Sequence, residues 1–431
     1  MTPSARLASA IELLAAIDLD PRKPADAVAN DFFRSRRFIG GADRRAVAER
    51  VWSALRARRR LAWWLARVEA PVTPRLLLAA SLVLDEVAVE TVAKSFSGGK
   101  FGPAPLVPAE QRALRLLEGH TLAHPEMPEA VALEVPDWLL IPLAARFGGA
   151  LATELAALAE PAPLDLRVNL LKATREEAQA SLAAEGVAAE PTPFSPWGLR
   201  VSGRRPITAG RTFLEGLIEI QDEGSQLVVG LMDARPGERV ADWCAGAGGK
   251  TLALAMMMGN AGHIAACDTS APRLEGAVRR LRRAGVHNVE RHALLPGDRW
   301  VKRRAGGFDR VLVDAPCTGT GTWRRNPDAR LRLSARDLAE LLEKQARILA
   351  EAARLVRSGG RLVYATCSLL TEENEAQVQG FLAAHPEFAV LPLERAWTLP
   401  GAPPCPGPHL ALTPHRHGTD GFFAAVLERR A

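Results

Sequence analysis

From about residue 236 onward, the chain alternates short apolar segments with amphipathic ones, and this alternation strongly limits its possible folds. "GERVADWC", "GHIAACD", "FDRVLVDAP" and "GRLVYATCS" are short and apolar, as buried strands are. Helical segments such as "KTLALAMMM" and "SARDLAELLEKQARILAEAARLV" separate them. The pattern predicts an α/β fold with a parallel, doubly wound sheet. Two last apolar segments, "FAVLPL" and "GFFAAVLER", predict a hairpin at the edge of this sheet.

The rest of the chain predicts two further domains. Residues 4–92 have helical apolar spacing with almost no strand signal, which predicts an all-α domain over residues 1–135. The stretch that begins "PLDLRVNLLK" follows a strand–helix–strand pattern, and "FLEGLIEIQD" (213–222) adds another strand. The sequence therefore predicts linker helices and a small α+β module over residues 136–230. It predicts the doubly wound domain over residues 231–431.

Composition limits the class of protein. With 431 residues, 48% of them hydrophobic, the chain can bury a substantial core. Its net charge of +6 favours an anionic partner such as nucleic acid, although a genomic base composition that favours arginine codons would produce the same excess. The sequence has neither a signal-peptide pattern nor an uncharged apolar run of the roughly 18 residues that span a bilayer, so we expect a cytoplasmic protein without a membrane contact. Five scattered cysteines without a CxxC pair predict neither a disulfide framework nor a metal site.

A glycine-rich loop, "DWCAGAGGKT" (242–251), joins the first strand of the doubly wound domain to its helix. Glycines allow the backbone to approach a ligand closely at a helix N-terminus. Asp268 ends the next strand, where a carboxylate can accept both hydroxyls of a ribose. A P-loop requires GxxxxGK[ST], but Cys244 stands at its first position, and the GxGxxG spacing of a dinucleotide site is not met either. S-adenosylmethionine, which has no pyrophosphate, fits the pattern.

Two cysteines follow neighbouring strands of the predicted sheet. Cys317 lies in "DRVLVDAPCTGTG" and Cys367 in "YATCSLLTEENEA". In a doubly wound sheet these strands lie side by side, roughly 4.8 Å apart, so both thiols should project from one edge, together with Asp314 and the glycine loop. Free cysteines are commonly small core residues. Positions just beyond strand ends, however, favour a functional pair.

Such a pair suits the methylation of a pyrimidine. Cytosine C5 is a poor nucleophile, but a thiolate that adds to C6 makes C5 enamine-like and able to attack a sulfonium methyl group. A carboxylate near N3 and N4 can stabilise charge on the ring. A base must afterwards remove the C5 proton, and a second thiol can assist that step.

In these motifs the chain resembles a known family, the Sun-type (RsmB/Nop) RNA cytosine-5 methyltransferases. The resemblance rests on "CAGAGGKT", "DAPCTGTGTWRRNPD", "YATCSLLTEENEAQV" and the terminal "DGFFAAVL". Upstream, "LDLRVNLLK" and "FLEGLIEIQDEGSQLV" resemble the family's small ferredoxin-like or RRM-like RNA-binding module. The Arg-rich helical N-terminus resembles the NusB-type domain of bacterial members that act on 16S ribosomal RNA. The resemblance implies a monomeric, S-adenosylmethionine-dependent enzyme that forms 5-methylcytosine in 16S ribosomal RNA.

The resemblance also implies roles for individual residues. Cys367 would be the nucleophile on C6, and Cys317 would assist product release. Asp314 would contact both cytosine and cofactor, and Lys250 would lie near the base and the cofactor's methionine end. The cofactor would be held by Cys244, Ala245, Gly246, Ala247, Gly248, Gly249, Lys250, Asp268, Arg273, Asp298 and Asp314. Gly246 and Ala247 depart from the family, which usually has Ala and Pro there.

Some alternatives remain open. The same chemistry on transfer RNA is one, and a non-catalytic RNA-binding ribosome assembly factor is another. Arg324 and Arg325 are expected to hold a phosphate next to the target base. The segment "RRLRR" (279–283) is expected to form an exposed helix face. Cys244, Cys267 and Cys405 are expected to be structural or surface thiols.

Overall fold

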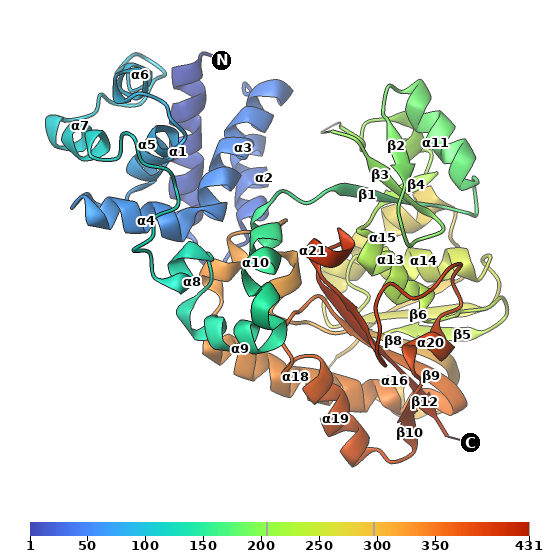
Figure 1. Cartoon of the computed structure of the whole chain (residues 1–431). Coiled ribbons are helices and arrows are strands. Elements are labelled where there is room, and N and C mark those ends of the chain that lie inside the picture. The colour runs from blue at the N-terminus through green and yellow to red at the C-terminus, as the bar shows by residue number, and fades with distance from the viewer. Residues whose placement is uncertain (204–205, 296–297, 431) are drawn as a thin grey trace. The chain divides into compact units, whose positions relative to one another are not determined.

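The structure, a computed structural model, describes residues 1–203, 206–295 and 298–430 (Figure 1). It contains two compact units. The helical unit comprises Met1–Pro161 together with Trp323–Leu333, and the α/β unit comprises Ala162–Thr322 and Ser334–Ala431. These bounds differ from those of the three predicted domains, which stay a prediction.

The described residues of the helical unit form helices and loops. Its helices are α1 (Pro3–Leu19), α2 (Ala25–Ser35), α3 (Gly41–Arg56), α4 (Arg58–Arg67), α5 (Pro74–Leu84), α6 (Val89–Ser95), α7 (Pro108–Arg115), α8 (Glu129–Ala132), α9 (Asp137–Phe147), α10 (Leu151–Ala159) and α17 (Ala329–Arg332), with a 3-10 turn at Gly148–Ala150. Thr2 and Thr73 cap α1 and α5, and a proline follows each of them at the first helical position. The predicted helical character is confirmed, and a likeness to NusB stays a prediction.

One stretch of the helical unit, Asp137–Ala159, has the length and composition of a helix that crosses a membrane. It is interrupted at Gly148, where the backbone takes a φ of 51° and α9 ends. Leu143 and Leu155 lie in the protein interior. Helices packed in a protein core meet the same criteria, so the stretch is weak evidence for a membrane span.

The α/β unit begins with a small four-stranded sheet of order β2-β3-β1-β4. Its elements are β1 (Leu164–Val168), α11 (Arg175–Ala184), β2 (Ala189–Pro191), β3 (Gly198–Val201), α12 (Arg211–Leu214) and β4 (Ile218–Ile220). The strand predicted over 213–222 is shorter than expected, because its first residues belong to α12. Gly216 (φ +77°) turns the chain between the two elements, and a Cβ there would lie 2.1 Å from the carbonyl oxygen of Arg283.

The large sheet has the order β10-β12-β9-β8-β5-β6-β7, with β11 paired to β12. Its strands are β5 (Arg239–Asp242), β6 (His263–Asp268), β7 (Val289–Ala293), β8 (Phe308–Asp314), β9 (Val356–Thr366), β10 (Phe388–Val390), β11 (Leu410–Leu412) and β12 (Phe422–Arg429). The strands β5, β6, β7, β8 and β9 pair with one another in parallel, as predicted. The last two predicted strands, β10 and β12, pair antiparallel at the edge of the sheet as expected, with β12 between β9 and β10. They do not form a simple hairpin, because α20 (Leu393–Ala396), β11 and α21 (Pro414–His417) lie between them in the sequence.

Helices cover both faces of the large sheet (Figure 1). The helices that accompany this sheet in the sequence are α13 (Glu223–Gly230), α14 (Gly249–Met257), α15 (Ala271–Ala284), α16 (Trp300–Arg303), α18 (Ala335–Ala353), α19 (Glu375–Ala384), α20 (Leu393–Ala396) and α21 (Pro414–His417). Successive strand residues point to opposite faces. Leu312 packs into the core that contains α13 and α14, whereas Val311 and Val313 pack into the core that contains α18 and α19. Both faces are buried, which explains the nearly continuous apolar strands.

Candidate active site

The loops that follow β5, β6, β8 and β9 meet at the carboxyl edge of the large sheet. β5 pairs in parallel with β6 and β8, and β8 pairs in parallel with β9. A cavity of about 760 Å³ opens at this edge. Seven of the predicted site residues line this cavity: Cys244, Asp268, Arg273, Asp298, Asp314, Cys317 and Cys367. The remaining residues of the predicted glycine loop, and Lys250, are not among its lining residues.

The glycine loop takes a conformation that requires glycine. Gly246 has a φ of +55°, and Gly248, the residue before α14, has a φ of +79°. The left-handed region is costly for residues with a Cβ. The backbone N–H of Ala245 donates to the carbonyl of Cys267 (2.9 Å), which fixes the loop against the end of β6.

Asp268 is a buried carboxylate at the end of β6. It accepts hydrogen bonds from the N–H groups of Gly246 (2.9 Å) and Ser270 (2.8 Å). Arg273 approaches it to 4.0 Å. A carboxylate has about four acceptor sites, so Asp268 retains the capacity to accept hydroxyl groups from a ligand. Its place in the cavity suits the predicted role at a ribose.

Asp298 lies on the same cavity after β7. It accepts from the Nε2 of His292 (2.5 Å) and from the N–H of Trp300 (2.8 Å). These hydrogen bonds, that from His292 foremost, lower the pKa of the Asp298 carboxyl. Apolar side chains at Leu294 and Val301 line the cavity beside it, as an adenine ring would require.

The two thiols predicted to act together are in contact. The sulfur atoms of Cys317 and Cys367 lie 3.4 Å apart. The contact with Cys367, together with burial, raises the pKa of the Cys317 thiol well above its usual value. Cys317 is therefore protonated at neutral pH, and its S–H can donate a hydrogen bond to the Cys367 sulfur.

Cys244, Cys267 and Cys405 are a different kind of thiol. Burial raises the pKa of each of them. A buried thiol with a raised pKa is a poor nucleophile, so the expectation of structural roles agrees with their environments.

Lys250 and Asp314 form an ion pair beside the thiols. The Nζ of Lys250 donates to Asp314 at 2.7 Å and lies 5.7 Å from the centre of the Phe422 ring, in the terminal "DGFF" segment. Burial by itself disfavours the lysine charge, but the charge and hydrogen bond of Asp314 outweigh it and raise the pKa of Lys250. Lys250 therefore keeps its charge and holds the Asp314 carboxylate in place at the cavity.

A buried carboxylate that the sequence analysis missed supports this site. Glu373 accepts from the N–H (2.9 Å) and hydroxyl (2.5 Å) of Thr318 and from the side-chain amide of Gln345 (2.8 Å). Gln345 also donates to the carbonyl of Pro316 (3.0 Å). Glu373 thus holds both sides of Cys317. It lies in the quoted "TEEN" segment, but nothing in its spacing revealed these partners.

Two glycines bring the motif segments together. The N–H of Gly321 donates to the carbonyl of Cys367 (2.9 Å), and the N–H of Gly421 donates to the carbonyl of Gly321 (2.9 Å). A Cβ on Gly321 would lie 2.3 Å from the carbonyl oxygen of Gly421. This close approach explains glycine in both "TGTG" and "DGFF".

Two arginines hold the outer side of the glycine loop. Arg280 donates to the carbonyl of Ala247 (2.7 Å), and the buried Arg167 donates to the carbonyl of Gly249 (2.9 Å). Glu219 on β4 contacts Arg280 (3.4 Å) and Arg283 (2.5 Å). The expectation that 279–283 is simply an exposed helix face is therefore wrong for Arg280 and Arg283.

The expectation for Arg324 is also contradicted. Its side chain is buried, and its carbonyl accepts from Arg56 (3.2 Å), while the carbonyl of Arg325 accepts from Trp52 (3.4 Å). Both arginines belong to the helical unit. Arg324 is thus unsuited to hold a phosphate.

Comparison with known proteins identifies the family. A family profile described as 16S rRNA methyltransferase RsmB/F matches residues 229–428, and one described as the RsmF/B-like ferredoxin-like domain matches 135–208. A probable ribosomal RNA small subunit methyltransferase B from Synechocystis is 38% identical over 301 residues, which are 68% of this chain and 66% of that relative. The chain belongs to the RsmB/F family. The resemblance identified from the motifs is confirmed.

Solved structures agree with the RsmB/F assignment. A methyltransferase homolog protein from Pyrococcus horikoshii is 30% identical, with a TM-score of 0.61, and the match covers 71% of this chain and all of that one. The solved structure of PH0851 is 27% identical, with a TM-score of 0.80, over 100% of this chain and 99% of that one. The Rossmann-like methyltransferase sheet is thereby confirmed, and S-adenosylmethionine is the cofactor of the RsmB/F family. The match spans just under two thirds of the Synechocystis relative.

Proposed function

We propose that this protein is an S-adenosylmethionine-dependent methyltransferase that forms 5-methylcytosine in 16S ribosomal RNA. The observation that carries the proposal is the pair of sulfur atoms 3.4 Å apart beside the Lys250–Asp314 ion pair, on the cavity that Asp268 and Asp298 also line. The names of the matching RsmB/F profile and of the Synechocystis relative support ribosomal RNA of the small subunit as the substrate.

The cofactor would be held by the glycine loop, Asp268 and Asp298, and it supplies an electrophilic methyl group. The backbone turn at Gly246 and the remaining acceptor capacity of Asp268 fit an adenosyl group that carries no phosphate.

The side chains of this chain account for the activation of the base. The Cys367 thiolate adds to C6 of cytosine, and the C5–C6 π electrons move toward C5 and the N3 side of the ring. Asp314, held by Lys250, hydrogen-bonds the N3/N4 edge and stabilises the charge on the ring. The target base must leave its stack to reach the cavity.

After C5 is methylated, its proton must leave before the C–S bond can break. Cys317 assists this proton removal, the electrons of the C5–H bond re-form the double bond, and Cys367 departs as a thiolate. Because the raised pKa keeps Cys317 protonated, the departing Cys367 thiolate accepts the Cys317 proton across their 3.4 Å contact, and the Cys317 sulfur takes the C5 proton in its place.

Methyl transfer with labelled cofactor tests the proposal. We expect label in deproteinised 16S ribosomal RNA, recovered as 5-methylcytosine after digestion to nucleosides, and little label in transfer RNA. Label in transfer RNA alone would show that transfer RNA, and not 16S ribosomal RNA, is the substrate. Recovery of a methylated nucleoside other than 5-methylcytosine would refute the proposed methylation of C5. Binding to RNA with no transfer to any RNA would favour an assembly factor.

The cysteine variants test the two thiol roles separately. Cys367→Ala should abolish transfer, whereas Cys317→Ala should accumulate a covalent protein–RNA adduct that survives denaturing electrophoresis. Cys405→Ala, at a thiol that is not among the cavity-lining residues, is the control and should retain activity. Normal turnover of the Cys317 variant without adducts would refute the role given to that thiol.

A further inference from the structure

One face of α18 lines the cavity that contains the thiols. Lys344, Arg347, Ile348 and Glu351 all contribute to its wall. Their spacing of three, four and seven residues places them on a single side of the helix. Lys344 and Arg347 are exposed to solvent, so they lie where the cavity opens.

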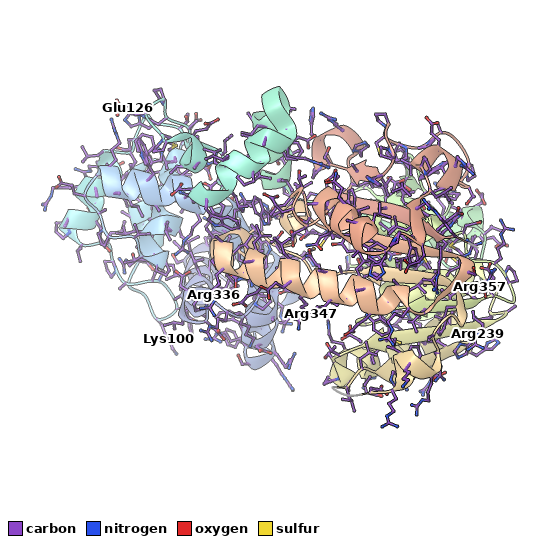
Figure 2. The ribbon with its side chains drawn as sticks, turned by 90° about the horizontal axis from the view of Figure 1, so that it is seen from below. Lys100, Glu126, Arg239, Arg336, Arg347 and Arg357 are labelled. Carbon is purple, nitrogen blue, oxygen red and sulfur yellow. The ribbon has the colours of Figure 1, made fainter. Side chains whose placement is uncertain are left out.

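Neither of these two cations is held in an ion pair with a described residue, although Glu351, one turn after Arg347, lies on the same wall. In the part of the chain that the structure describes, neither Lys344 nor Arg347 has an ion pair or a hydrogen bond. By contrast, Arg336 at the start of the same helix pairs with Glu340 at 2.8 Å. Figure 2 labels Arg336 and Arg347, both on α18.

α18 is fixed firmly beside the cysteines. Gln345, which is fully buried, donates to the carbonyl of Pro316 (3.0 Å) and to Glu373 (2.8 Å). Pro316 directly precedes Cys317. Lys344 and Arg347 therefore project from a rigid element whose position is set by the catalytic loop.

We propose that Lys344 and Arg347 bind the phosphates that flank the cytidine delivered to Cys367. This inference rests on the proposed function, because it takes an RNA strand as the substrate. A base that enters the cavity carries its two phosphodiesters to the opening, where charge-assisted hydrogen bonds from a lysine and an arginine can hold them. The cofactor is a less suitable partner, since its sulfonium and ammonium groups outweigh its single carboxylate and leave it with a net positive charge, whereas each phosphodiester is an anion.

The salt dependence of RNA binding tests the proposal. The double variant Lys344→Gln, Arg347→Gln removes two phosphate contacts from a single strand, so the slope of log K against log salt should become shallower by about 1.4. At about 0.1 M salt the affinity for deproteinised 16S ribosomal RNA should fall about tenfold or more. The KM for S-adenosylmethionine should not change.

Arg336→Gln is the matched control, because it removes one charge from the same helix at a side chain that is not among those lining the cavity. It should leave the slope nearly unchanged. An unchanged slope in the double variant would overturn the proposal, and so would a rise confined to the KM of the cofactor, which would assign the pair to that ligand. Formation of 5-methylcytosine by the unaltered protein is scored separately, so failure of the phosphate contacts and failure of the proposed function are distinguishable.

Discussion

At the scale of single residues, Glu373 shows how a side chain can serve the site without lining the cavity. Its carboxylate holds Thr318 and Gln345 on either side of Cys317. Cys317 and Cys367 were predictable, because each closes a strand with a recognisable motif. Glu373 was not predictable, since its partners come from segments 28 and 55 residues away in the sequence.

We expect Glu373→Gln to impair catalysis without loss of cofactor binding. The amide replaces one acceptor oxygen with a donor, so the Thr318 contacts weaken and the Cys317 loop shifts. A displacement of about 1 Å can lower a rate about a hundredfold. Single-turnover rates and cofactor affinity, measured beside Glu372→Gln, check this. Equal rates in the two variants would show that Glu373 does not position the loop.

Asp242, at the end of β5, makes stability depend on pH. Burial foremost, opposed by the hydroxyl of Thr251 at 2.7 Å, raises the pKa of its carboxyl to about 7. The folded chain keeps this proton up to about pH 7, whereas the unfolded chain releases it near the ordinary value of 3.8. The carboxyl therefore makes the free energy of unfolding fall as pH rises between these two values.

Asp242→Asn should lack this contribution, because an amide does not titrate yet still accepts from Thr251. The free energy of unfolding of the variant minus that of the original protein should increase from about pH 4 to about pH 7. Above about pH 7 this difference should stay constant. Urea unfolding at several pH values measures it. Parallel curves across this range would show that Asp242 ionises as readily in the folded chain as in the unfolded one.

At the scale of elements, the alternation of strands and helices predicted the parallel part of the sheet and the adjacency of β5, β8 and β9. It did not predict the insertion of β12 between β9 and β10. Long connections separate β12 from β10, and their path depends on packing rather than on local pattern.

The amphipathic pattern of α15 agrees with the buried side chains of Leu274 and Leu281, but it does not specify the contacts of the arginines on that helix. Periodicity tells which side of a helix is apolar, but not which carbonyl lies within reach of a long polar side chain. Arg280 on that helix reaches the carbonyl of Ala247 in the glycine loop.

Arg280→Ala should weaken cofactor binding several-fold, since the carbonyl of Ala247 loses its donor and the loop gains freedom. The affinity for S-adenosylmethionine by calorimetry is the measurement, and the affinity for RNA at low salt is the comparison. Arg279→Ala, an exposed neighbour on α15, serves as the control. If both variants bound the cofactor as the original protein does, Arg280 would have no positioning role.

At the scale of the whole molecule, the segment Trp323–Leu333 belongs with the helical unit although it follows the Cys317 motif in sequence. The buried Arg330 donates to the carbonyl of Glu134 (3.1 Å), and Ala25 donates its N–H to Asp328 (3.0 Å). Burial lowers the pKa of Arg330 to about 10, while Glu134 counteracts this. The sequence could not reveal this placement, because the motif continues without a break through Trp323.

Arg330→Ala should destabilise the helical unit by about 3 kcal/mol, because it leaves the buried carbonyl of Glu134 without its donor and opens a cavity beside Trp323. Arg332→Ala, which removes a partly exposed partner of Asp328, should have a smaller effect. Thermal unfolding followed by circular dichroism compares the two. A larger loss in the Arg332 variant would contradict the importance assigned to Arg330.

This placement of Trp323–Leu333 means that the backbone passes between the units at three points, after Pro161, Thr322 and Leu333. A deletion that removes residues 1–161 would leave Trp323 and Arg330 without the interior that surrounds them. An exchange of the helical part between related proteins would likewise succeed only if the short stretch after the cysteine motif were exchanged along with it. Evolution can therefore replace either half only by matched changes at two distant places in the gene.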